Sequence, residues 1–183
     1  PCSITLSVTF QSDTNQGLND EGWAFSDFTV YPAESLAVLY TEDEAVSAGW
    51  KPAPVAAKVT TAGSAGKVHG PWGRENKQAM LDVSIPQGVT ECAVSWRSWA
   101  VYTRDGESDR LFIDGNMVWQ KKARHSGCRD GWQTGPSDFP HSSKQHPSCY
   151  VDVSVKVPCS GTMKLKFTSG VDQGLTDEAW AFS

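Results

Sequence analysis

The sequence lacks the features that would place the chain in several common classes. No apolar stretch approaches the roughly 20 residues that a membrane-spanning helix needs. No signal peptide is recognisable, so we expect a mature or excised segment without membrane insertion. Basic residues are in deficit, 16 against 21 acidic ones, and the net charge of -5 argues against nucleic acid as a partner. No Asn-x-Ser/Thr sequon occurs, so N-linked glycan is not expected.

Catalytic motifs are also missing from the sequence. No Ser, Cys or Lys stands in a recognisable nucleophile motif with a histidine, and no glycine-rich phosphate loop precedes a helix. Acidic residues could be paired as in a glycoside hydrolase, but any acidic domain offers such pairs. The sequence therefore predicts a protein that is not an enzyme.

A repeat occupies the two ends of the chain. The segment NQGLNDEGWAFS, residues 15–26, recurs as DQGLTDEAWAFS, residues 172–183, and the opening PCS recurs as residues 158–160. One offset aligns both copies without a gap, so that Trp23 corresponds to Trp180. A gap-free match of this length favours a tandem array of domains over two similar hairpins within one fold.

The repeat predicts a division of the chain into three parts. We expect residues 1–32 to be the closing segment of a preceding repeat, residues 33–49 to be a linker, and residues 50–183 to form one β-sandwich repeat. Residues 1–32 would then pack mainly on a different sandwich, or at the boundary between two. A short junction containing proline would make such an array stiff.

The cysteines become an even set once the repeat is considered. Cys2 is the counterpart of Cys159, so four of the five cysteines belong to one repeat. An even number indicates two disulfides and an oxidising, extracellular compartment. Of the three possible connectivities we favour Cys128 with Cys149, closing a long loop, and Cys92 with Cys159, joining two strands. Cys2 would then have no partner within the chain.

The hydrophobic pattern is that of β-strands. Apolar and polar residues alternate in Leu6–Phe10, Val151–Val157 and Met163–Phe167. Further strands are expected at Trp23–Tyr31, Met80–Ile85, Cys92–Tyr102, Arg110–Ile113 and Met117–Gln120, the last two joined by a turn at Asp114-Gly115-Asn116. Many short strands with Gly-, Pro- and Ser-rich loops predict an all-β fold, an antiparallel β-sandwich of the jelly-roll type.

Three segments depart from this pattern. The stretch from Gln120 to Ser148 has little periodicity and is expected to be a long loop held by its disulfide. Ser35–Ser47 fits a short helix or, equally, a strand followed by linker. Trp96 and Trp99 lie out of phase with each other, which suggests a bulge in their strand.

Two motifs carry a family resemblance. The run SWRSWAVYTRDGESDRLFIDGNMVW, residues 95–119, followed by a cysteine-bearing loop and by LKFTSGVDQGLTDEAWAFS, resembles a repeated extracellular domain of algal and ciliate surface proteins. More distantly, it is similar to jelly-roll adhesion modules of the MAM type. The resemblance covers roughly Trp50–Ser183 and implies a jelly-roll fold in a cell-surface or flagellar-hair-like protein. The chain differs from the family pattern at Ala181, where glycine is usual.

Acidic residues gather in two places that folding could unite. Asp105 and Glu107 lie at the entrance of a strand, while Asp172, Asp177 and Glu178 lie in the closing segment. Calcium takes six to eight oxygen ligands, which two such loops with backbone carbonyls can supply. The alternative is that these are solvated turn residues. We predict a structural calcium ion that holds loops at one end of the sandwich.

The histidines suggest zinc as a further ligand. His125 with Cys128, and His146 with Cys149, form two H-x-x-C pairs that would suit zinc, but a disulfide competes for the same sulfurs and is favoured.

Two tryptophans lie in segments expected to be loops. Trp72 and Trp132 could stack on sugar rings if they are exposed, although such tryptophans are more often buried anchors. Two function classes therefore remain: a structural repeat of an extracellular filament, matrix or surface coat, whose partners are neighbouring copies, and a calcium-dependent carbohydrate-binding or adhesion module.

Overall fold

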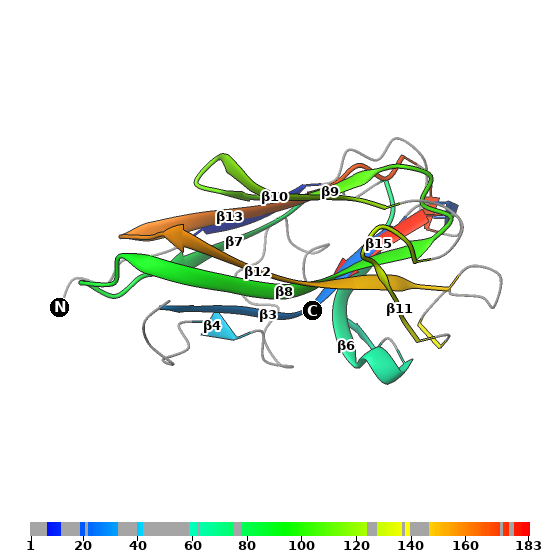
Figure 1. Ribbon diagram of the computed structural model, residues 1–183, viewed down its shortest axis with the longest axis horizontal. Coiled ribbons are helices and arrows are strands. Elements are labelled where there is room, and N and C mark those ends of the chain that lie inside the picture. The colour runs from blue at the N-terminus through cyan, green and yellow to red at the C-terminus, as the bar shows by residue number, and fades with distance from the viewer. Residues whose placement is uncertain are drawn as a thin grey trace.

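The computed structural model describes most of the chain from residue 59 onward and parts of the chain before it. The described residues are 7–11, 19–20, 22–32, 40–41, 59–61, 63–74, 78–123, 128–136, 138–139, 147–172, 174–175 and 178–183. They form an all-β sandwich of two stacked sheets, as the sequence predicted (Figure 1). Among the described residues, no helix has the length and apolar character needed to cross a bilayer.

The first sheet has five strands in the order β1-β7-β13-β9-β10. Their bounds are β1 Ser7–Gln11, β7 Gln78–Ser84, β9 Ser108–Ile113, β10 Asn116–Lys122 and β13 Thr162–Ser169. Its pairings are antiparallel except for a parallel pairing of β1 with β13. The predicted hairpin joins β9 to β10, and both Asp114 (φ 50°) and Gly115 (φ 83°) take the positive φ of a type I′ turn.

The second sheet follows the order β11-β12-β8-β15-β3-β6-β5, with β4 paired to β3. Its strands are β3 Gly22–Pro32, β4 Tyr40–Thr41, β5 Val59–Thr61, β6 Lys67–Trp72, β8 Glu91–Tyr102, β11 Gln133–Thr134, β12 Cys149–Pro158 and β15 Glu178–Phe182. Two short strands, β2 Asn19–Asp20 and β14 Gly174–Leu175, pair with each other, and a 3-10 turn, η2, spans Gly63–Ala65.

The main core lies between the two sheets. Leu81, Leu111 and Leu165 of the five-stranded sheet pack with apolar residues of the other sheet, which include Val94 and Trp96. The Trp96 ring contacts Trp119 and Phe167 edge-on, at centroid distances of 5.2 and 5.0 Å. Alternation along β12 and β13 thus buries one face of each strand and leaves the other polar, as expected for a sandwich.

The bulge predicted between Trp96 and Trp99 does not lie in β8; the irregularity at this place lies in β3, between Ser26 and Thr29, opposite Arg97 and Ser95. β8 pairs with β12 without a register shift from Ala100 to Glu91, so Trp96 and Trp99 point to opposite faces of the sheet. Both are buried, because Phe139 and Tyr150 cover Trp99 on the outer face with ring centroids 5.0 and 5.1 Å away. The out-of-phase tryptophans reflect a sheet that is covered on both faces at this end.

The first part of the chain joins both sheets of the sandwich. β1 lies in the five-stranded sheet and β3 in the other. Assignment of residues 1–32 to a preceding repeat stays a prediction, because it concerns a neighbouring copy. Of Ser35–Ser47, only Tyr40–Thr41 is described, and it is a strand.

Candidate functional site

The two copies of the repeat lie side by side in both sheets. β1 runs parallel to β13 with Val8 opposite Leu165 and Phe10 opposite Phe167. β3 runs parallel to β15 with Trp23 opposite Trp180. Each of these pairs joins a residue to its own counterpart in the repeat, so like pairs with like in exact sequence correspondence.

Both copies are also registered to the same residues of a third strand. In the second sheet, Trp23 and Trp180 both pair with Ala100 of β8, while Ala24 and Ala181 both pair with Trp99. The opposite edge of β8 is held by β12, in which Cys149 pairs with Ala100. Two equivalent segments are therefore matched to one edge of β8, and we call this edge, with the corresponding edge of β7, the closing-strand position.

The closing-strand position in the second sheet is lined by buried aromatic residues. Trp180 is fully buried, and its ring lies 4.8 Å from that of Trp72, which is 1% exposed. Trp72 lies at the end of β6, a strand that the sequence did not predict because His69, Gly70 and Pro71 are typical of a loop. Trp72 is therefore a buried anchor, the alternative to an exposed sugar-stacking residue that the sequence analysis had named, and a glycan contact there stays a prediction.

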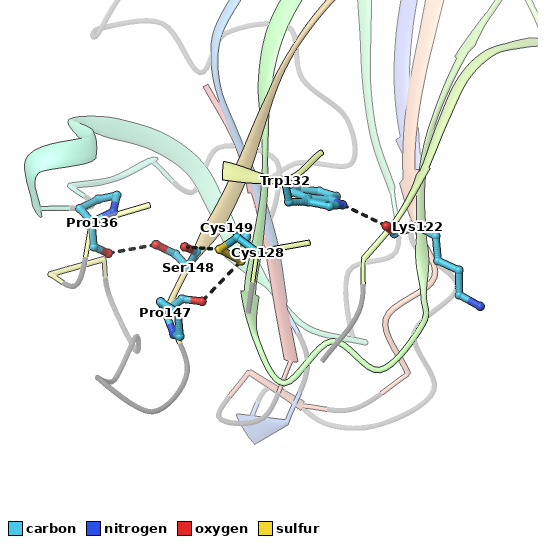
Figure 2. The surroundings of a disulfide bond; sticks show 7 residues. All are labelled: Lys122, Cys128, Trp132, Pro136, Pro147, Ser148 and Cys149. Atoms are coloured by element: carbon cyan, nitrogen blue, oxygen red, sulfur yellow. Dashed lines mark hydrogen bonds between the residues drawn. A yellow bond between two sulfur atoms is a disulfide. The ribbon is translucent and has the colours of Figure 1, made fainter. Parts of the chain in front are cut away.

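Trp132 anchors the long loop and is likewise buried. Its side chain is only 6% exposed, packs with Ala100 and Ala123, and donates a hydrogen bond of 2.9 Å from Nε1 to the carbonyl of Lys122 (Figure 2). Trp132 is thus also a buried anchor, and a glycan contact there stays a prediction. The indole serves instead to hold the loop after β10 against the sheet.

Both disulfides join the cysteines that the sequence paired. Cys92 is bonded to Cys159 and Cys128 to Cys149. The first ties β8 to the residue that follows β12, next to the start of β13; the second closes the loop before β12. Since cytosolic thiols are kept reduced, two disulfides indicate a compartment outside the cytosol. Zinc coordination by Cys128 and Cys149 is incompatible with their disulfide; His125 and His146 lie outside the described residues.

The loop packs tightly beside its disulfide, as Figure 2 shows. Ser148 is fully buried, and its Oγ donates to the carbonyl of Pro136 at 3.0 Å, while the amide of Gly135 donates to the carbonyl of Ser148 at 2.7 Å. A Cβ on Gly135 would lie 2.7 Å from the Trp99 ring. The described part of the loop thus packs over Trp99 and is held by the disulfide that the sequence predicted.

Removing the loop disulfide should destabilise the domain. Replacing both Cys128 and Cys149 with alanine frees a loop with a sequence separation of 21 residues. We expect the free energy of unfolding to fall by about 3 kcal/mol, from the greater entropy of the unfolded chain. Urea unfolding of the variant and the parent measures the difference. An unchanged midpoint would mean that the hydrogen bonds around Ser148 hold the loop without the bond between the sulfurs.

A buried ionic cluster lies at the end of β8, where the sequence predicted a calcium site. Arg104 is 1% exposed; its Nη2 lies 2.9 Å from Oδ1 of Asp109, and its Nε lies 3.5 Å from Oε2 of Glu107. Glu107 also accepts hydrogen bonds from the amides of Asp105 and Gly106, at 2.9 and 3.2 Å. Ser98 Oγ lies 3.5 Å from Asp109 Oδ2, which connects the cluster to β8.

Arg104 is the functional residue that the sequence analysis missed. Its side chain supplies the positive charge that the acidic pattern was thought to require from a metal ion. A sequence signal was available, because an arginine three and five positions before two acidic residues can pair with both when the chain turns back on itself. Pairing through a loop depends on tertiary structure, so the spacing alone was not decisive.

The structure brings together only part of the predicted calcium ligands. Glu107 is committed to Arg104 and to two amides, Asp105 is exposed, and Asp172 is half-buried. Asp177 and the side chain of Glu178 lie outside the described residues. Within the part of the chain that is described, no three Asp, Glu, His or Cys residues are grouped as a metal site requires. Calcium binding stays a prediction.

A melting experiment tests the calcium prediction directly. If calcium links Asp105 to the closing segment, a chelator should lower the melting temperature, because the ion binds only the folded state. The variant combining Asp105→Asn with Asp177→Asn should then melt at the chelated temperature of the parent, with or without calcium. Asp114→Asn, in the distant hairpin turn, is the matched control. A melting curve that ignores both chelator and added calcium would remove the site.

Comparison with known proteins adds no relative. No protein-family model, curated protein or solved structure matches the chain at a significant level.

Proposed function

We propose that the chain is a structural repeat module of an extracellular filament, matrix or cell-surface coat, of the flagellar-hair kind. The observation that carries the proposal is the like-with-like pairing of the two repeat copies, Phe10 on Phe167 and Trp23 on Trp180. A segment that occurs at a fixed period and pairs in register with its own copy suits a protein whose partners are further copies of itself.

The construction of the sandwich supports a mechanical role. Cys92–Cys159 holds the closing segment to β8, and Cys128–Cys149 holds the loop that covers the outer face of the same sheet. Disulfides at both places oppose unfolding, and they persist in an oxidising extracellular compartment. Such a disulfide-bonded domain would be a stiff unit suited to end-to-end assembly.

Electron microscopy of the native protein tests this proposal. Material isolated without reducing agent should contain rows of equal beads, each the size of one domain, and partial proteolysis should release fragments that differ by one repeat. Reduction, which opens both disulfides, should disorder the rows. Native material consisting of single, separate domains would contradict the proposal. Calcium-dependent binding to a glycan array by such single domains would favour the adhesion alternative.

A further inference from the structure

The strand pairings of β1 show that it stands where its own repeat counterpart would stand. β13 pairs with β7 only over Thr162–Lys164, where Lys164 lies opposite Asp82. Continuing that register would place Leu165 on Leu81 and Phe167 on Ala79. β1 holds those places instead, because Val8 lies opposite Leu81 and Phe10 opposite Ala79. Residue by residue, β1 replaces the second half of β13 on the edge of β7.

The second sheet shows the same equivalence. β15 and the first half of β3 are registered to the same residues of β8, with Trp180 and Trp23 both opposite Ala100, and the two segments also pair in parallel with each other. The second half of β3, beyond the end of β15, pairs with β8 and no longer with β15, with Val30 opposite Val94. One edge of a strand can bond only one neighbour at a given residue, so the two copies are alternative partners for the residues of β7 and β8 that they share.

We infer that residues 7–32 and residues 164–182 are interchangeable occupants of the closing-strand position, and that this position receives the repeated segment of a second copy of the domain. The inference deepens the proposed function, and rests on it for the choice of a second copy as the partner. Recognition would be strand addition, in which backbone hydrogen bonds give affinity and side-chain sites give specificity.

The Cys92–Cys159 disulfide and the site around Trp180 indicate which copy of the repeated segment is given to the second domain. Cys159 is bonded to Cys92 shortly before β13, so the C-terminal copy is tethered to its own domain. This makes residues 7–32 the donor. The site that buries Trp180 against Trp72 suits the same residue type in the donor, and Trp23 is the counterpart of Trp180 in the repeat. Donor and acceptor are different parts of the surface, so the contact is head-to-tail and generates open chains.

A labelled peptide tests the inference on the full chain. The probe is residues 5–32, which contain no cysteine, and the acceptor is the chain carrying Thr9→Pro, whose own β1 cannot complete its ladder. We expect saturable 1:1 binding by fluorescence anisotropy, and competition by an unlabelled peptide of residues 162–183. The same probe with Thr9→Pro is the matched control and should bind at least tenfold more weakly.

Three results would overturn strand exchange: no binding, equal binding by the proline probe, or binding that residues 162–183 fail to displace. The unmodified chain is a second acceptor in case Thr9→Pro does not fold; there the probe competes with the chain's own β1 and binds more weakly, with the same order of competitors. Failure here leaves the proposed function standing, because an array of independently closed beads needs no exchange. Failure of the proposed function shows instead as single domains in the microscope.

Discussion

Replacing Arg104 with alanine is expected to lower the free energy of unfolding by about 3–5 kcal/mol, because it leaves two buried carboxylates without their counter-charge. Glu107 and Asp109 are 8% and 3% exposed at their side chains, so water cannot replace the guanidinium. Beside the cluster, the amide of Gly170 in the closing segment donates to the carbonyl of Ser108 at 2.9 Å. Urea unfolding measures the loss.

Arg97, on β8, provides a control arginine in an exposed ion pair. Its Nε lies 2.6 Å from Oδ1 of Asp152, but the two side chains are 29% and 55% exposed. Arg97→Ala should cost no more than about 1 kcal/mol, the usual value of an exposed ion pair. A chain with Arg104→Met, Glu107→Gln and Asp109→Asn removes all three charges together and should recover part of the loss. Equal effects of Arg104→Ala and Arg97→Ala would show that the cluster is open to water.

The strands were predictable because their cause is local. One buried and one polar face force a period of two, and the patterns at Val151–Val157 and Met163–Phe167 correspond to β12 and β13. Two disulfides could be predicted because the repeat sets Cys2 aside and leaves four cysteines. The observed pairing is the one favoured among their three possible connectivities. The turn at Asp114-Gly115 followed from residues that accept positive φ.

The missed features depend on what covers each residue. Nothing in the local sequence around Trp72 or Trp132 indicates that β15 packs against the first and the sheet at Ala100 against the second. β6 escaped notice because Gly70 and Pro71 are typical of loops, yet the strand is buried from Val68 to Trp72. Arg104 was missed for a related reason, as only the fold brings its guanidinium between two carboxylates.

The repeat itself was evident from the sequence, but its consequence for pairing was not. A period says that two segments can occupy equivalent places, and leaves open whether the places belong to one sandwich or two. The register answers part of this, since Ser7 and Lys164 both lie opposite Asp82 of β7. Because both copies share partners on β7 and on β8, one copy should be able to replace the other within one domain, and this redundancy can be measured.

A double-mutant cycle between Thr9→Pro and Lys166→Pro measures that redundancy. The two residues are counterparts in the repeat and lie opposite each other in β1 and β13. Proline removes a ladder amide and is poorly tolerated inside a sheet. Thr9→Pro alone should cost less than about 1 kcal/mol, because β13 can close onto β7 in the same register.

Lys166→Pro alone should cost more, about 3 kcal/mol, because β13 also pairs with β9, where Lys166 lies opposite Phe112. β1 can still hold the edge of β7, so the fold should survive. With both prolines neither copy can fill the closing-strand position, and we expect the combined loss to exceed the sum of the single losses by about 1–3 kcal/mol. Urea unfolding of the four chains gives the coupling. Strictly additive losses would mean that each copy fills its own strand position. The shared register would then reflect only the similarity of the two sequences, and the copies would not be interchangeable.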